Sequence, residues 1–241
     1  MYVRLVVELG AGSALPSLLA ATLPGERHAS VVVATEYPDP LIMETLRGNV
    51  ERARQQRGKP HPSIDDQGTE ECAGEEQGYC KIECAEFEWG SDVSQLLLSL
   101  CSLTQLASDT WRSDPPQPCS QLLPSDAGSG FDVVIMSDLL HFDSSHAALV
   151  GSLSALLAKH AGSRAYVAAG KYTNQDVCDR FIDRAQRAGI VLVEQRHEQA
   201  GWQGKMAVRG PGLDREGLRR RKEMSRFWVG RWIEWPSTPN D

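Results

Sequence analysis

The 241-residue sequence predicts an α/β protein with a doubly wound, mostly parallel sheet of seven strands. Two observations predict this fold. Short β-branched runs alternate with longer helix-like segments along most of the chain, an order that places helices on both faces of a parallel sheet. The last two runs are not joined by an ordinary long helical crossover, so we expect an antiparallel pair with an edge strand at that end of the sheet.

The predicted strands are short and rich in β-branched or aromatic residues. Pro or Gly residues lie near the ends of several of the predicted helices. The expected strands are Leu5–Leu9, Ala29–Thr35, Ile82–Phe87, Phe131–Ser137, Arg164–Ala169, Ile190–Arg196 and Phe227–Trp235. The expected helices are Ser13–Thr22, Pro40–Arg54, Ser91–Leu106, Ala147–His160 and Gln175–Ala188. In the second of these helices we expect Leu41, Thr45 and Val50 to face the core.

Length and composition predict a single domain over residues 1–241, with polar inserts at about 59–78 and 107–130, and we expect this domain to be a monomer. The net charge of −7 disfavours nucleic-acid binding. No apolar run approaches the ~20 residues that a membrane span needs. The six cysteines form no regular framework, and Cys80 and Cys84 are the only pair with a zinc-like spacing, so we expect reduced thiols and no metal site. These features predict a cytoplasmic protein, with the nucleus as the alternative location.

A glycine turn follows the first strand, in the segment Glu8-Leu9-Gly10-Ala11-Gly12. Glycines there allow a tight turn and let a ligand approach the main chain closely. Glu36 follows the second strand, where a carboxylate can accept both hydroxyls of a ribose. Together these features predict a nucleoside-cofactor site, whereas each alone is also consistent with an ordinary turn or a solvated cap. A dinucleotide fingerprint needs a third glycine where this sequence has Leu15, and Glu8 suits a cationic ligand.

The glycine segment resembles the first motif of class I S-adenosylmethionine-dependent methyltransferases. Four segments in order resemble methyltransferase family 16, which includes nicotinamide N-methyltransferase-like and protein-lysine methyltransferases. They are VVELGAGSALPSLLAA, VVVATEYPDPLIMETLRGNV, EFEWG and FDVVIMSDLLHFDSSHAALV. The tyrosine-proline-aspartate after Glu36 and the SDLLHF segment are most similar to the fungal subgroup that methylates translation elongation factor 1-alpha near its N-terminus. The resemblance covers most of the chain from Leu5 to Glu194, apart from the two inserts.

The resemblance implies a Rossmann-like methyltransferase fold with S-adenosylmethionine as its cofactor. Glu8, Gly10 and Gly12 would then hold the methionine part of the cofactor. Glu36 would take the ribose hydroxyls, and Trp89, after the third strand, would lie against the adenine. The family also has a segment ahead of the first strand that helps to cover the cofactor, whereas this chain starts almost at that strand.

The same resemblance implies that Ser137 and Asp138 stand at the end of the fourth strand and face the transferring methyl group. Many protein-lysine methyltransferases carry Asp-x-x-Tyr there, but this sequence has Asp138-Leu139-Leu140-His141. We interpret Asp138 as a catalytic acceptor of an N–H from the substrate amine, with a helix cap as the alternative. We interpret His141 as a proton acceptor, directly or through water, because histidines titrate near neutral pH. An exposed structural histidine is the alternative.

The resemblance implies an N-methyltransferase acting on a protein amine, either a lysine or an N-terminal amine, with elongation factor 1-alpha as one candidate protein substrate. Three alternatives stay open from the sequence. The acceptor could be a small nicotinamide-like amine, or the chain could be an inactive cofactor-binding module. An NAD-dependent oxidoreductase is the weaker third alternative, since the third glycine of its fingerprint is missing.

Overall fold

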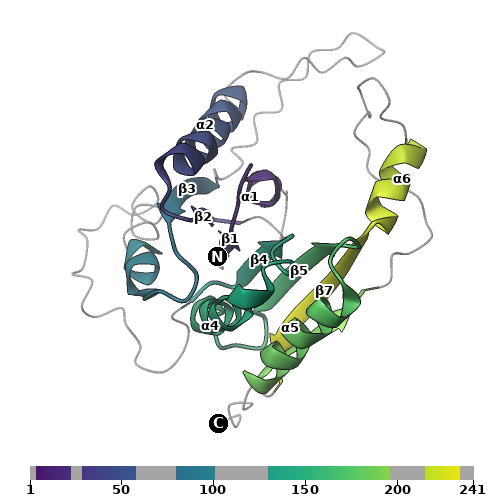
Figure 1. Cartoon of the computed structure of the whole chain (residues 1–241). Helices are drawn as coiled ribbons and strands as arrows, with labels where there is room; N and C mark the ends of the chain where they lie inside the picture. Colours follow the sequence, from purple (N-terminus) through teal and green to yellow (C-terminus); the bar gives the residue numbers. More distant parts are fainter. Residues whose placement is uncertain (1–3, 23–28, 58–79, 101–129, 196–214, 234–241) are drawn as a thin grey trace.

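The computed structural model describes residues 4–22, 29–57, 80–100, 130–195 and 215–233 (Figure 1). Both predicted inserts lie outside the described residues, apart from Gly130. The strands are β1 (Leu5–Leu9), β2 (Val31–Glu36), β3 (Lys81–Glu86), β4 (Val133–Ser137), β5 (Arg164–Gly170), β6 (Ile190–Glu194) and β7 (Ser225–Trp232). The helices are α1 (Leu15–Ala20), α2 (Pro40–Arg57), α4 (His146–Leu156), α5 (Gln175–Arg187) and α6 (Arg215–Glu223), with the short 3-10 helix η3 (Asp143–Ser145). Residues 94–100 are also helical.

All seven strands form one sheet in the order β3-β2-β1-β4-β5-β7-β6. The pairs between β3, β2, β1, β4 and β5 are parallel, whereas β7 is antiparallel to both of its neighbours. The predicted doubly wound fold with an antiparallel pair at its end is therefore confirmed. β7 is the last of the described strands in the sequence, yet it lies between β5 and the edge strand β6.

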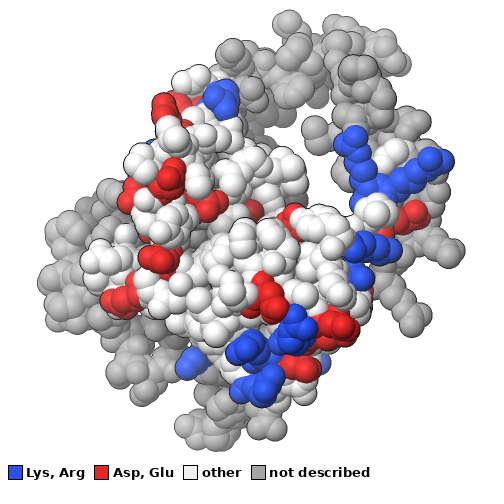
Figure 2. Space-filling view, in the orientation of Figure 1, with Lys and Arg blue, Asp and Glu red and all other residues white. Residues whose placement is uncertain are grey.

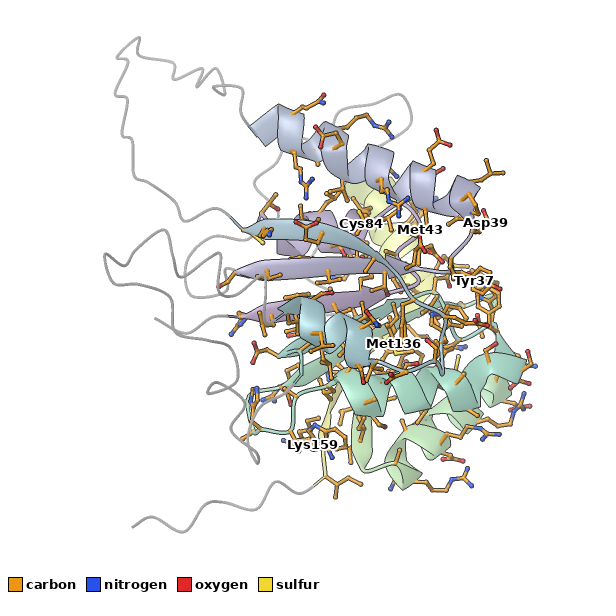
Figure 3. All side chains as sticks on the ribbon, turned by 90° about the vertical axis from the view of Figure 1, so that its left-hand side faces the viewer. Tyr37, Asp39, Met43, Cys84, Met136 and Lys159 are labelled. Atoms are coloured by element: carbon orange, nitrogen blue, oxygen red, sulfur yellow. The ribbon has the colours of Figure 1, made fainter. Side chains whose placement is uncertain are left out.

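Helices cover both faces of the sheet (Figures 1 and 3). In β1, Val6 packs in a buried cluster with residues of α1 and α2, whereas its neighbour Val7 joins the larger cluster that includes residues of α4 and α5. This alternation follows from the two-residue period of a strand, which sends successive side chains to opposite faces. The strands are therefore buried on both sides, as their near-continuous apolar sequences predict.

The buried face of α2 differs from our prediction. Met43, Leu46 and Val50 are buried at 0%, 0% and 1% exposure, whereas Leu41 is 75% exposed. Thr45 is exposed as well, so of the three predicted core residues only Val50 is correct. The buried residues are spaced by three and four positions, so they form one stripe along the helix. The predicted set, with spacings of four and five positions, does not form such a stripe.

The carboxyl ends of the parallel strands meet at one edge of the sheet. In Figure 3 the strands point towards Tyr37, which follows β2, while Lys159 lies at the opposite edge. Residues that follow β1, β2, β4 and β5 are thereby brought together, as is usual for ligand sites in open α/β sheets. Within the described ranges, no helix is both long and apolar enough to cross a membrane.

Candidate functional site

The glycine turn after β1 has the backbone geometry that its residues predict. Gly10 and Gly12 have φ angles of 61° and 50°, a region that glycine enters at little cost. A Cβ added at Gly10 would lie 2.7 Å from Leu139 and 3.1 Å from Trp89, so close packing also requires glycine there. At Gly12, apart from the glycine and its two chain neighbours, no described atom lies within 4 Å of the position of such a Cβ. The main chain at Gly12 is exposed and open to a ligand.

The glycine turn and Glu36 face one another directly. The Gly12 N–H donates to Glu36 Oε2 at 2.7 Å, and the Tyr37 N–H donates to Oε1 at 2.9 Å. A carboxylate has about four lone-pair sites, so each oxygen of Glu36 can accept one further hydrogen bond. Glu36 is half-buried, at the end of β2, and remains able to bind a diol beside the open main chain of Gly12.

Glu8 lies behind the turn rather than on its open side. It is 1% exposed, and its Oε2 accepts the Ser17 N–H at 3.0 Å and the Ser17 hydroxyl at 2.5 Å. Burial raises the pKa of Glu8 from 4.5 to about 7, and the two bonds from Ser17 oppose this effect only in part. Its hydrogen bonds in the structure join β1 to α1, so it positions the turn. The predicted contact with a methionine moiety stays a prediction.

Trp89 lies in the loop after β3 and forms one side of the site. It is half-buried, and its ring meets that of Phe142 edge to face at 5.4 Å between centroids. The next residue, Gly90, donates its N–H to Ser152 of α4 at 2.8 Å, which fixes this loop against the helix. Trp89 therefore brings an aromatic surface to the same edge as Gly10, where an adenine contact was predicted.

Ser137 ends β4 and Asp138 follows it, beside the glycine turn, because β4 is the parallel neighbour of β1. Ser137 is half-buried and pairs in register with Ala168 of β5. Asp138 is exposed and has a φ angle of 62°, a left-handed conformation that is uncommon for residues other than glycine. Its carboxylate accepts the Gly170 N–H at 3.1 Å and the Tyr172 hydroxyl. The structure thus presents a fixed, exposed carboxylate.

Tyr172 belongs to the site, although the sequence analysis did not select it. Its hydrogen bond to Asp138, together with slight burial and the charge of that carboxylate, raises its pKa to about 12, so the phenol keeps its proton at neutral pH. Its position in the sequence could have indicated that it belongs to the site. Tyr172 follows β5 just as Asp138 follows β4, and the ends of adjacent parallel strands lie at one edge.

His141 is exposed beside this carboxylate. Its ring lies 4.0 Å from that of Phe142 and 6.3 Å from that of Tyr172, measured between centroids. The hydrogen bonds that hold Asp138 come from the end of β5 and not from His141. His141 is placed where a substrate could reach it, and its role in proton transfer stays a prediction.

These residues fit an adenosyl sulfonium cofactor on geometric grounds. The open, side-chain-free position at Gly12 allows a bulky ligand to approach the main chain, and Glu36 retains acceptor capacity for the two hydroxyls of a ribose. Acidic groups suit a ligand that carries a positively charged sulfur, and the aromatic Trp89 suits a purine.

Comparison with known proteins gives a consistent set of relatives, although no family model matches the chain. The chain is 28% identical over 193 residues to the Protein N-terminal and lysine N-methyltransferase efm7 of Neurospora crassa, covering 78% of this chain and 53% of that protein. It is 30% identical over 189 residues to the protein of the same name from Yarrowia lipolytica, covering 77% of this chain and 55% of that protein. The chain therefore spans about half the length of these relatives.

Among solved structures, a methyltransferase from Pyrococcus furiosus is similar, with a TM-score of 0.45 and 11% identity, over 96% of this chain and 77% of that one.

Proposed function

We propose that this chain, a homologue of the fungal protein N-terminal and lysine N-methyltransferases, is an S-adenosylmethionine-dependent methyltransferase that acts on a protein amine. The observation that carries this proposal is the direct contact between Gly12 and Glu36, with the exposed carboxylate of Asp138 at the end of the adjacent strand β4. These positions combine a nucleoside-binding geometry with a polar group for an acceptor.

The cofactor would supply a methyl group activated on its sulfonium. In this proposal Glu36 holds the ribose hydroxyls, and the open turn of Gly10 and Gly12 receives the methionine part. Trp89 lies against the adenine. We also propose that Glu8 holds the methionine part of the cofactor, as the resemblance implies, and that Ser137 at the end of β4 contacts the cofactor.

The acceptor must be a neutral amine, because the lone pair of its nitrogen forms the new bond to carbon. An ordinary lysine has a pKa of about 10.4 and is mostly protonated at neutral pH, whereas an N-terminal amine, with a pKa near 8, is less so. We propose that Asp138 accepts an N–H of the amine and thereby directs its lone pair. His141 takes the proton that the nitrogen must lose, directly or through water.

Two surface features support a protein acceptor over a small amine. Tyr37, Phe142 and Tyr172 are 52%, 43% and 69% exposed, so the described edge of the site is open. Figure 2 shows Lys and Arg side chains gathered over α6, which ends just before β7. Because the Lys171 N–H donates to the carbonyl of Met224 at 2.8 Å, this basic helix is joined to the turn that carries Tyr172. An acidic protein surface is the matching partner.

Translation elongation factor 1-alpha is the specific acceptor that we propose, since the segments after Glu36 and around Asp138 resemble the subgroup that acts on it. We also propose that the protein works in the cytoplasm. This location follows from the reduced thiols that we expect of the chain, and Cys84 and Cys178 form no disulfide within the described residues.

Calorimetry with S-adenosylmethionine, S-adenosylhomocysteine and NAD tests the cofactor assignment. We expect the two adenosyl ligands to bind and NAD not to bind. Glu36→Ala should weaken S-adenosylhomocysteine binding by roughly tenfold or more, because hydrogen bonds to a charged acceptor contribute about 1.5–3 kcal/mol. Glu44→Ala, on the exposed face of α2, is the matched control and should leave the affinity unchanged. Binding of NAD alone would overturn the proposal.

Transfer of tritium from labelled S-adenosylmethionine tests the acceptor. Purified elongation factor 1-alpha and nicotinamide are offered separately to the same enzyme sample. We expect label in the elongation factor and none in methylnicotinamide. Label only in nicotinamide would move the protein to the small-molecule alternative, and binding without any transfer would indicate an inactive cofactor-binding module.

A further inference from the structure

Asp138 is held in an unfavourable backbone conformation by three separate contacts. Its φ angle of 62° is left-handed, and this conformation lowers the stability of the folded protein when the residue is not glycine. Its N–H donates to the carbonyl of Ala168 at 2.8 Å, and its carboxylate accepts the Gly170 N–H and the Tyr172 hydroxyl. Strain of this kind persists where surrounding contacts over-determine it, and it concentrates at functional sites.

Tyr172 reaches Asp138 by folding back over the end of its own strand. A Cβ added at Gly170 would fall on the Tyr172 ring, so the absence of a side chain at Gly170 makes room for that ring. Gly170 has no left-handed φ angle, so its backbone conformation alone does not require glycine. Tyr172 is 69% exposed, and its place over Gly170 contributes little to the hydrophobic core.

The Tyr172 ring is also one of a group of neighbouring rings, with His141 and Phe142, on the segments that follow β4 and β5. His141 lies 6.3 Å from it and 4.0 Å from Phe142, between ring centroids, and Phe142 is 43% exposed. Exposed aromatic faces attract an ammonium group, and a neighbouring carboxylate strengthens this attraction. A protonated amine would therefore be drawn to this edge from solvent.

A carboxylate beside the acceptor has two opposing effects on methyl transfer. It orients the amine by accepting an N–H, but its negative charge also favours the protonated form, which has no lone pair to react. A hydrogen bond from a neutral donor to one carboxylate oxygen fixes the orientation and withdraws part of the charge. The Tyr172 hydroxyl is such a donor.

We propose that Tyr172 is a positioning residue for methyl transfer, whose hydroxyl holds Asp138 and moderates its charge, and whose ring forms a wall of the acceptor-amine site. This inference rests on the proposed function, and it adds a residue from the β5–α5 turn to the acceptor side of the site. The two parts of the side chain have separable roles, because the hydroxyl acts on orientation and protonation while the ring acts on binding.

The test compares Tyr172→Phe and Tyr172→Ala with the unaltered chain, using tritium transfer from S-adenosylmethionine to purified elongation factor 1-alpha. In Tyr172→Phe we expect kcat to fall roughly three- to tenfold at pH 7 with little change in KM, because one hydrogen bond to Asp138 is lost. The acid side of the pH profile should move to higher pH, since the freed carboxylate stabilises the ammonium form of the bound amine. In Tyr172→Ala, KM for the elongation factor should rise as well.

The pH comparison isolates Tyr172 because the other charged groups stay the same in both proteins. The charged side chains on the segments around this edge include His141, Asp143, Lys171, Arg180 and Arg226, together with Arg220, Arg221 and Lys222 in the last turn of α6. Asp143 and Arg180 pair with each other at 2.6 Å, and Arg226 donates to the Thr173 carbonyl at 3.2 Å. Tyr172 itself keeps its proton across the assay range, because its pKa is about 12.

Two further variants separate this role from a general structural effect. Gly170→Ala displaces the ring and should raise KM as Tyr172→Ala does. Tyr166→Phe removes a hydroxyl from β5 at a residue that stacks on Phe227, away from Asp138, and should change neither kcat nor the pH profile. All of these proteins should bind S-adenosylhomocysteine equally well.

The outcomes distinguish failure of this inference from failure of the proposed function. An unaltered kcat and pH profile in Tyr172→Phe, with normal transfer by the unaltered chain, would overturn the role of Tyr172 alone. Absence of transfer by the unaltered chain would overturn the proposed function, and the inference with it. Equal losses in Tyr166→Phe and Tyr172→Phe would show a nonspecific effect on the fold and would also reject the inference.

Discussion

Replacement of Glu8 by glutamine should change how the stability of the protein depends on pH. Glu8 is 1% exposed, and burial raises its pKa from 4.5 to about 7. The folded protein therefore holds the proton of Glu8 more tightly than the unfolded chain does. The resulting stabilisation is fully present below pH 4.5 and is lost as the pH rises through 7. At about 1.4 kcal/mol for each pKa unit, the loss is about 3 kcal/mol.

Glutamine has nearly the same shape, stays neutral, and can accept the Ser17 N–H and hydroxyl through its amide oxygen. We expect the free energy of unfolding of the two proteins to be similar at pH 4.5, and Glu8→Gln to be more stable by about 3 kcal/mol at pH 8. Urea unfolding followed by circular dichroism at five pH values measures this difference. Glu51→Gln, exposed on α2, is the control and should follow the unaltered protein. Parallel stability curves for Glu8→Gln and the unaltered protein would refute the reasoning.

Two further predictions concern stability and are checked by the same urea titrations at pH 7. Leu46→Ala should cost about 2–5 kcal/mol because the side chain is fully buried, whereas Leu41→Ala should cost under ~0.5 kcal/mol; equal costs would reject the observed face of α2. Gly10→Ala should destabilise by at least about 1 kcal/mol because of its left-handed φ angle and the contact with Leu139. Gly48→Ala, inside α2 and in ordinary contact with its surroundings, should instead stabilise by about 0.5–1 kcal/mol, and a destabilised Gly48→Ala would contradict this assignment.

The order of strands and helices could be predicted from local sequence because buried parallel strands are short, continuous apolar runs. Leu5–Leu9 was predicted with the bounds that the structure shows. Helix faces were harder to predict, because Leu41, Ile42 and Met43 follow one another in the first turn of α2, and such a run fits several faces of a helix. Only packing against the sheet decides among them, and it selects Met43.

The two halves of the candidate site differed in the same way. Gly12 and Glu36 could be paired from sequence, because each lies at the carboxyl end of one of two strands that a βαβ unit makes neighbours. The bond between Asp138 and Tyr172 joins residues 34 positions apart, and it depends on a left-handed backbone and on the missing side chain at Gly170. No short motif records that combination of backbone angle and space.

The place of β7 in the sheet has a consequence for how the molecule is assembled on the ribosome. β5 and β6 are synthesised before β7, yet they are linked in the sheet only through β7, which pairs with both of them. Until β7 has paired, one side of β5 presents unpaired N–H and C=O groups, which favours association with other chains. Because Met224 binds the main chain of Lys171, the turn that carries Tyr172 is also secured only at this late stage. Nascent chains that stop short of β7 should therefore be vulnerable to aggregation and should require protection by chaperones.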